Sequence, residues 1–94
     1  GADVALIGTS RDRNVRVSGR AKRDAVNSGV NLGKIMEDIS SNYQGTGGGH
    51  AGAAGIDVVA DMDVIIKECR DRIRSVLQGK PNPSICEVLQ EKSE

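Results

Sequence analysis

Hydrophobic residues follow two different patterns in the first part of the chain, and each pattern predicts a strand. The apolar run at residues 4–7, closed by Gly8, is typical of a strand buried on both faces. From residue 15 apolar and polar positions alternate, which places Arg16, Ser18 and Arg20 together on the polar side. A turn at residues 11–14 separates the two segments, so they are expected to form a β-hairpin.

The clearest amphipathic helix is predicted directly after Asn31, which can cap it. Its apolar positions recur at i, i+3, i+4, i+7 and i+11; they are Leu32, Ile35, Met36, Ile39 and Tyr43. Gly45 supplies a left-handed stop, so the helix is expected to end near residues 42–44. Met36 and Tyr43 are interpreted as core and rim residues rather than ligand groups.

A third strand and a second helix are predicted further along the chain. The small and β-branched side chains at residues 53–60 suit a crowded central strand. Asp61 or Asp63 then caps a helix that ends near Gly79. Cys69 lies on the apolar stripe of this helix, so its thiol is expected to be buried and inert.

Residues 80–94 are expected to be poorly ordered or to form a short helical tail. Ser84 and Glu87 have the spacing of a capping box, which indicates one helical turn, and residues beyond Gln90 are expected to be disordered. The 94 residues suffice for one small core. The order of strands and helices therefore predicts a single domain of the α+β class.

Composition limits the classes of function. The formal net charge is zero, which argues against a broadly basic nucleic-acid binder. Residues 11–23, however, hold six Lys or Arg residues against one Asp, so a local basic patch is expected. The two cysteines are too few for a disulfide scaffold and lack CxxC spacing, which favours a reducing, cytoplasmic setting.

The ends and the hydropathy of the chain add two expectations. No apolar run approaches the length of a membrane span, so a soluble chain without a membrane partner is expected. The sequence begins with Gly1 rather than Met, which suggests a processed tag or an excised fragment.

The run Gly47, Gly48, Gly49, His50 is the strongest candidate site. Glycines leave their amides unobstructed by a Cβ, and an imidazole adds a hydrogen-bond donor, so a loop of this kind can bind an anion. If Arg20 converges on this loop, the site would hold a phosphodiester or a terminal phosphate. The alternatives are a flexible loop with a surface histidine, and an ordinary solvated strand face around Arg20.

Other chemistry finds little support in the sequence. A single histidine without a carboxylate cluster at ligand spacing argues against a metal site or a resident cofactor made by this chain alone. No nucleophile lies near His50 in sequence, and no lysine follows the glycines as in a P-loop. No catalytic residue is therefore predicted in this chain.

Residues 47–55, GGGHAGAAG, resemble the GGGHxxAAG signature of the DHHA1 domain. That domain is the C-terminal, substrate-binding partner of the DHH phosphoesterases, which include RecJ-type single-strand exonucleases and nanoRNA hydrolases. Ser18 and Arg20 are similar to the family's S-x-R strand, and residues 27–35 to the stretch before the first helix in archaeal RecJ-like proteins. The resemblance covers about residues 3–79. It implies a small mixed β-sheet with two main helices packed on it.

The resemblance also implies roles for individual residues. Residues 47–49 and His50 would contact the substrate's phosphate or terminal nucleotide, Arg20 would anchor the nucleic acid, and Ser18 is a weaker candidate. Residues 53–55 are assigned to close packing. The family's manganese- or magnesium-dependent centre belongs to an N-terminal DHH domain, and no DHH triplet occurs in these residues. The chain alone is therefore expected to be an inactive part of a phosphoesterase.

Three functions remain open at this point. The first is a domain that positions single-stranded nucleic acid or short oligonucleotides for a metal centre in the N-terminal DHH domain. The second is a tRNA-binding module, since a DHHA1-like domain also ends alanyl-tRNA synthetases, although the histidine of the motif fits the phosphoesterase form better. The third is a structural or dimerising domain, which the zero net charge and the lack of aromatic residues other than Tyr43 favour.

Overall fold

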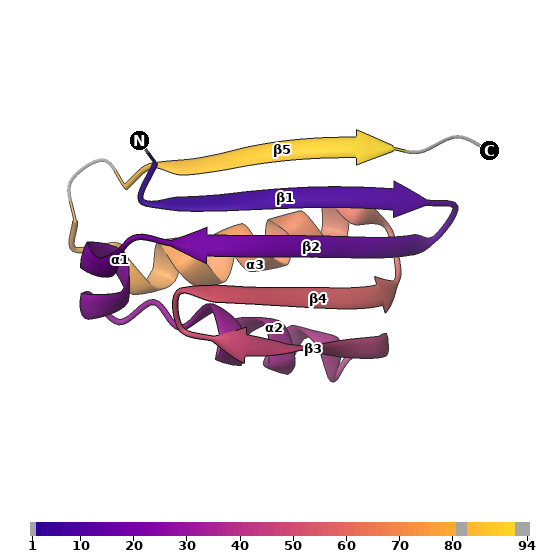
Figure 1. The fold of residues 1–94 in the computed structure, drawn as a ribbon, viewed down its shortest axis with the longest axis horizontal. Helices are drawn as coiled ribbons and strands as arrows, with labels where there is room; N and C mark the ends of the chain where they lie inside the picture. The colour runs from indigo at the N-terminus through magenta and orange to yellow at the C-terminus, as the bar shows by residue number, and fades with distance from the viewer. Residues whose placement is uncertain (1, 81–82, 92–94) are drawn as a thin grey trace.

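Five strands form one mixed sheet in the computed structural model, which describes residues 2–80 and 83–91. The strand order is β3-β4-β2-β1-β5, and only β1 and β5 run parallel (Figure 1). The elements in chain order are β1 (Val4–Arg11), β2 (Asn14–Ala21), α1 (Arg23–Asn27), α2 (Leu32–Ser40), β3 (Gln44–His50), β4 (Ala53–Val59), α3 (Met62–Val76) and β5 (Ile85–Glu91). The expected α+β class is confirmed.

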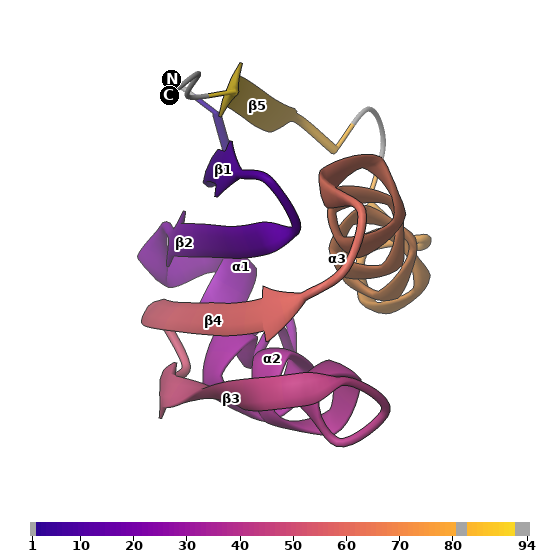
Figure 2. The same cartoon turned by 90° about the vertical axis from the view of Figure 1, so that its right-hand side faces the viewer.

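Both long helices pack on the same face of this sheet, and the opposite face carries no helix (Figure 2). The core lies between the two layers and is aliphatic; its largest fully buried side chains include Leu6, Val17, Leu32, Met36, Ile56 and Ile65. Side chains alternate across each strand. Every second residue of β1, β2, β3 and β4 therefore stands on the helix-free face.

The predicted hairpin is confirmed, and the alternation of β2 is as expected: Val15 and Val17 are buried, while Arg16 and Arg20 are exposed. The prediction that residues 4–7 are buried on both faces is wrong. Val4 and Leu6 are fully buried, but Ile7 is 50% exposed. The reason is that helices cover the sheet on one side only.

The two long helices, α2 and α3, lie where the apolar period of the sequence predicts them. Asn31 caps α2 by accepting a hydrogen bond on its side chain from the amide of Lys34, 3.1 Å away. Tyr43 is half-buried after the end of α2, where its hydroxyl donates to Glu68 of α3. Cys69 of α3 is fully buried, and burial raises the pKa of its thiol to about 11, which keeps it protonated at neutral pH.

The expected helical or disordered tail is a strand. Residues 85–91 form β5, which extends the sheet by pairing with β1. Ile85 packs partly on the core, and the Glu87 carboxylate accepts two hydrogen bonds from Nη1 of Arg70, at 2.9 and 3.0 Å. The capping-box spacing is a local signal, and pairing with a distant strand overrides it. Residues 92–94, within the stretch expected to be disordered, lie outside the described residues.

Asp3 joins the start of β1 to the segment that enters β5. Its carboxylate accepts a hydrogen bond from Lys80 Nζ at 2.7 Å and another from the amide of Ser84 at 2.9 Å. The bond from Lys80, followed by the bond from Ser84, lowers the pKa of Asp3 below its ordinary value of 3.8. The ionised form of Asp3 therefore stabilises the folded chain.

A pH-dependent contribution to stability follows from this contact. Because the folded pKa is lowered, the contribution is complete above pH 3.8 and is lost as the pH falls through the folded pKa. Asp3→Asn should therefore lower the melting temperature at pH 7, and the difference from the unchanged chain should shrink in acid. Circular dichroism melts at stepwise lower pH measure this. A difference that stays constant down to strongly acidic pH would contradict it.

Candidate functional site

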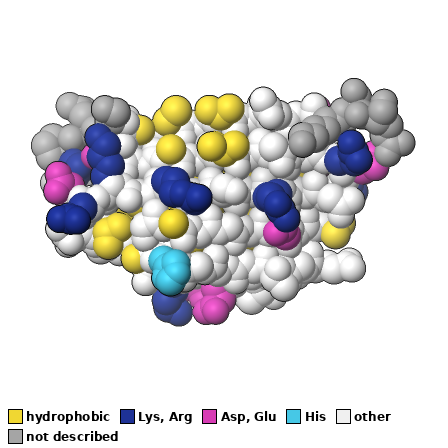
Figure 3. All heavy atoms as spheres, viewed as in Figure 1, with side chains coloured by type: hydrophobic (Ala, Val, Ile, Leu, Met, Phe, Trp, Pro, Cys, Tyr) yellow, Lys and Arg dark blue, Asp and Glu magenta, His cyan; other side chains and the backbone are white. Residues whose placement is uncertain are grey.

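Arg20 and His50 stand on the same cross-strand row of the helix-free face. Arg20 of β2 pairs with Ala53 of β4, which in turn pairs with His50 of β3. Neighbouring strands are about 4.8 Å apart, so the two backbones are separated by about 10 Å. Only the methyl group of Ala53 stands between the two long side chains. Figure 3 shows the single histidine side chain exposed on this face, with both Lys or Arg and Asp or Glu side chains near it.

Backbone hydrogen bonds fix this row in place. The turn at residues 51–52 directly follows His50 and joins β3 to β4. Its carbonyl groups accept bonds from two other elements: Gly52 from the amide of Ala21, at 2.9 Å, and Ala51 from the amide of Leu32, at 3.0 Å. The end of β2 and the start of α2 therefore hold the turn, and the positions of Arg20 and His50 are coupled.

The cross-strand row next to that of Arg20 and His50 is flat across β2, β4 and β3, because it carries only small side chains there. Ser18 pairs with Gly55, and Gly55 pairs with Gly48, so a hydroxyl and two glycines lie side by side. Residues 53–55 were all expected to serve close packing. That interpretation holds for Ala54, which is 8% exposed and belongs to the core, but Ala53 and Gly55 lie on the helix-free face. They separate the polar side chains of this face instead of packing under the helices.

The glycine run is part of an edge strand, and the prediction of a loop is wrong. α2 lies directly on β3: a Cβ on Gly47 would collide with the carbonyl group of Met36, and a Cβ on Gly33 would lie 2.5 Å from the carbonyl oxygen of Gly49. Gly49 also has φ +141, which other residues rarely adopt. Gly47 and Gly33 therefore serve the contact between helix and strand, and Gly49 serves the close pairing with Ala54 of β4. As an edge strand, β3 has amides on its outer side that no described strand pairs.

The charges of this face are uneven. Arg16 forms an ion pair with Asp57, with 2.8 Å between Nε and Oδ1, and this hydrogen bond raises the pKa of Arg16. Arg20 donates from Nη1 to the carbonyl of its neighbour Gly19, at 2.8 Å. Among the described residues, no carboxylate lies within ion-pair distance of Arg20 or His50. The charge of Arg20 is therefore available to a ligand.

The helix-free face is more basic than the net charge of the chain indicates. Its strand positions carry Arg11, Arg16 and Arg20 against Asp57. The acidic side chains of β5, Glu87 and Glu91, pair in register with Leu6 and Ser10, which belong to the other face. The acidic residues of β5 thus stand on the helix side of the sheet, and Asp57 is the acidic residue among the described strand positions of the basic face.

An apolar strip runs beside the basic positions. Ile7 of β1 and Val88 of β5 are paired in register, and they are 50% and 47% exposed. Ile7 also pairs with Ser18, so the strip borders the flat row directly. Figure 3 shows hydrophobic side chains gathered along this side of the face.

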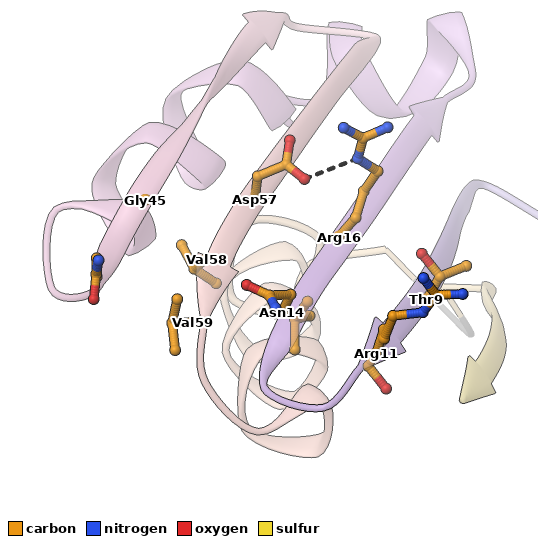
Figure 4. A pocket seen from close by; sticks show the side chains of 11 residues that line it. Thr9, Arg11, Asn14, Arg16, Gly45, Asp57, Val58 and Val59 are labelled. Atoms are coloured by element: carbon orange, nitrogen blue, oxygen red, sulfur yellow. Dashed lines mark hydrogen bonds and ion pairs between the residues drawn. The ribbon is translucent and has the colours of Figure 1, made fainter. Parts of the chain in front are cut away.

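A hollow of about 380 Å³ lies at the far end of the same face (Figure 4). Polar side chains of four strands line it, among them Arg11, Asn14, Arg16, Gln44 and Asp57. The sequence reasoning missed this place. The polar face predicted for β2, which contains Arg16, was a partial signal for it.

Metal sites and membrane spans are two further features to consider in the described residues. Across residues 2–80 and 83–91, no three His, Cys, Asp or Glu side chains are grouped so that they could hold a metal ion. The donor set described therefore does not fit a metal centre. None of the described helices has the length and hydropathy needed to cross a membrane.

Comparisons with known proteins agree on the family and the fold. Residues 1–78 match the sequence model of the DHHA1 domain. The chain is 38% identical over 74 residues to the uncharacterized protein MJ0988 of Methanocaldococcus jannaschii, a match that covers 72% of this chain and 22% of the relative. The chain thus spans about a fifth of that protein's length. The fold is similar to the C-Ala domain of Aquifex aeolicus alanyl-tRNA synthetase, with TM-score 0.60, 18% identity and coverage of 81% and 66% of the two chains.

Proposed function

The chain belongs to the DHHA1 domain family, and on this premise we propose that it holds phosphate groups of single-stranded nucleic acid between Arg20 and His50. The observation that carries the proposal is the shared row of these two residues, with an arginine that no described carboxylate neutralises. A guanidinium group donates two parallel hydrogen bonds to phosphate oxygens, and the imidazole supplies a donor from the other side. Ser18 and the outer amides of residues 47–49 are secondary contacts.

The proposal extends to a longer protein in which this chain would be one domain. We place the manganese- or magnesium-dependent phosphoesterase centre in a separate DHH domain, of a RecJ-like exonuclease or an oligonucleotide phosphoesterase. The family of the chain and its short span of the archaeal relative support this arrangement. In this arrangement the chain binds and orients the substrate and is inactive alone.

Single substitutions test the proposed site. Arg20→Ala and His50→Ala should each weaken binding of a 5′-phosphorylated oligothymidylate of four nucleotides, because each removes a charged or polar hydrogen bond to phosphate. The expected loss for Arg20→Ala is about 1.5–3 kcal/mol, or roughly ten- to 150-fold in Kd. The loss for His50→Ala should be about 1 kcal/mol. Fluorescence anisotropy at low salt measures both.

Arg74→Ala is the matched control. Arg74 lies in the last turn of α3, on the helical side of the molecule, and is exposed. Its removal takes away the same formal charge without touching the helix-free face. Equal losses for Arg74→Ala and Arg20→Ala would show that only the overall charge matters, and unchanged binding for both site variants would overturn the assignment.

A second candidate function is binding of tRNA. The fold likeness to the C-Ala domain of an alanyl-tRNA synthetase favours it. The two functions differ in the preferred ligand. Binding of single strands predicts that a short oligonucleotide and tRNA have similar affinities for the site. Binding of tRNA predicts that tRNA has a much higher affinity than the oligonucleotide. Competition between the labelled oligothymidylate and unlabelled tRNA separates them. A chain that binds neither and self-associates would instead be a dimerising domain.

A further inference from the structure

We propose that the helix-free face holds a run of several nucleotides, with a second binding segment at the hollow formed by Arg11 and Arg16. This inference rests on the proposed function and specifies its substrate. An oligonucleotide would lie along β2, with one phosphate between Arg20 and His50 and later nucleotides over the hollow. A mononucleotide would occupy only the first of these places.

Three arginines are aligned along the helix-free face. Arg16 and Arg20 are four residues apart on β2, so about 14 Å separates them along the strand. Arg11 pairs with Asn14, one row beyond Arg16, at about 20 Å along the strands from the row of Arg20 and His50. A single phosphate group cannot contact both ends of this line. A chain of phosphates can contact each arginine in turn.

The hollow at the far end has the size and chemistry for part of a nucleotide chain. Its volume of about 380 Å³ lies within the range of small-ligand sites. The side chains of Asn14 and Gln44 offer amide donors and acceptors to a sugar or a base edge. Arg11 is exposed, and no described carboxylate is paired with it. Figure 4 shows Arg11 and Arg16 on the same side of Asn14, with the Arg16 side chain directed toward Asp57.

Asp57 controls the charge at this second segment. It is the acidic residue among the described strand positions of the helix-free face, and it neutralises Arg16. The side chains of Arg16 and Asp57 are 69% and 57% exposed, so water screens the ion pair and a phosphate can compete for the guanidinium. Asp57 also repels a phosphate in the hollow. Its presence therefore weakens the binding of longer ligands and leaves the Arg20 row unaffected.

Length-dependent binding tests the inference. The probes are 5′-phosphorylated oligothymidylates of two, four and eight nucleotides, titrated against the full chain. Arg11→Ala and Arg16→Ala should each weaken the longest probe by about two- to fivefold and leave the dinucleotide unchanged. For the longest probe, each should also reduce the slope of log K against log salt by about 0.7. Asp57→Asn should tighten the longest probe by a similar factor, a gain that misfolding cannot produce.

The outcomes distinguish this inference from the proposed function. The second segment is overturned, and the site at Arg20 and His50 is retained, if Arg20→Ala weakens binding of the dinucleotide but Arg11→Ala, Arg16→Ala and Asp57→Asn change the affinity of long and short probes by the same factor. If Arg16→Ala weakens all lengths by the same factor, Arg16 is not a length-dependent contact and the inference fails. If no probe binds and Arg20→Ala changes nothing, both proposals fail. A long probe binds more tightly than a short one simply because it offers more phosphates to the same site. Comparing the variants with the unchanged chain at each probe length removes this effect.

Discussion

Gly47→Ala is expected to lower the free energy of unfolding by about 3 kcal/mol, a large part of the stability of a small domain. The added methyl group would meet the main chain of α2, where it would lie 2.9 Å from the carbonyl carbon of Met36. Main-chain atoms cannot move away by changing a rotamer, so helix and strand must separate. Urea unfolding followed by circular dichroism measures the loss.

Gly55→Ala provides the matched control for this substitution. Gly55 lies on the neighbouring strand β4, on the helix-free face, and its added Cβ would meet only the carbonyl oxygen of Val17, at an ordinary 3.6 Å. Its free energy of unfolding should therefore change little, or rise slightly, because alanine restricts the unfolded chain more than glycine does. Similar losses for the two variants would show that the glycine run does not serve the contact with α2.

Sequence patterns predicted those elements whose signals are local. The polar face of β2 follows from the alternation of residues 15–20, and α2 follows from its apolar period and the cap at Asn31. Cys69 was expected to be buried because it lies on the apolar stripe of α3, and it is. In each case the pattern that predicts the feature lies within the residues of a single strand or helix.

Features that depend on distant pairing could not be predicted in the same way. β5 exists because the free side of β1 accepts it, and nothing within residues 84–89 contains that information. Similarly, residues 47–49 looked like a loop, whereas Gly47 lets α2 approach and Gly49 fits closely against Ala54 of β4; both contacts depend on the packing and not on local sequence. The common row of Arg20 and His50 depends on the register of three strands. The resemblance to a family brought these residues together, and the register supplies the geometry.

The double variant Arg20→Ala with His50→Ala should lose most binding of the single strand. If both side chains hold the same phosphate, removing either one leaves that phosphate loosely held, and the second removal costs less than it does alone. The combined loss should therefore fall short of the sum of the two single losses, by about 0.5 kcal/mol or more. Isothermal titration of the four proteins in this cycle measures the coupling.

The double variant Arg20→Ala with Arg11→Ala is the control for the Arg20 and His50 cycle. These two arginines are about 20 Å apart along the strands, beyond the range in which substitutions usually influence each other. Their losses should add for a long probe, because they contact different phosphates. Full additivity in the Arg20 and His50 cycle as well would show that the histidine contacts a different part of the ligand. If the losses couple strongly for Arg20 with His50 and add for Arg20 with Arg11, then Arg20 and His50 contact the same phosphate, as their shared row across β2, β4 and β3 predicts.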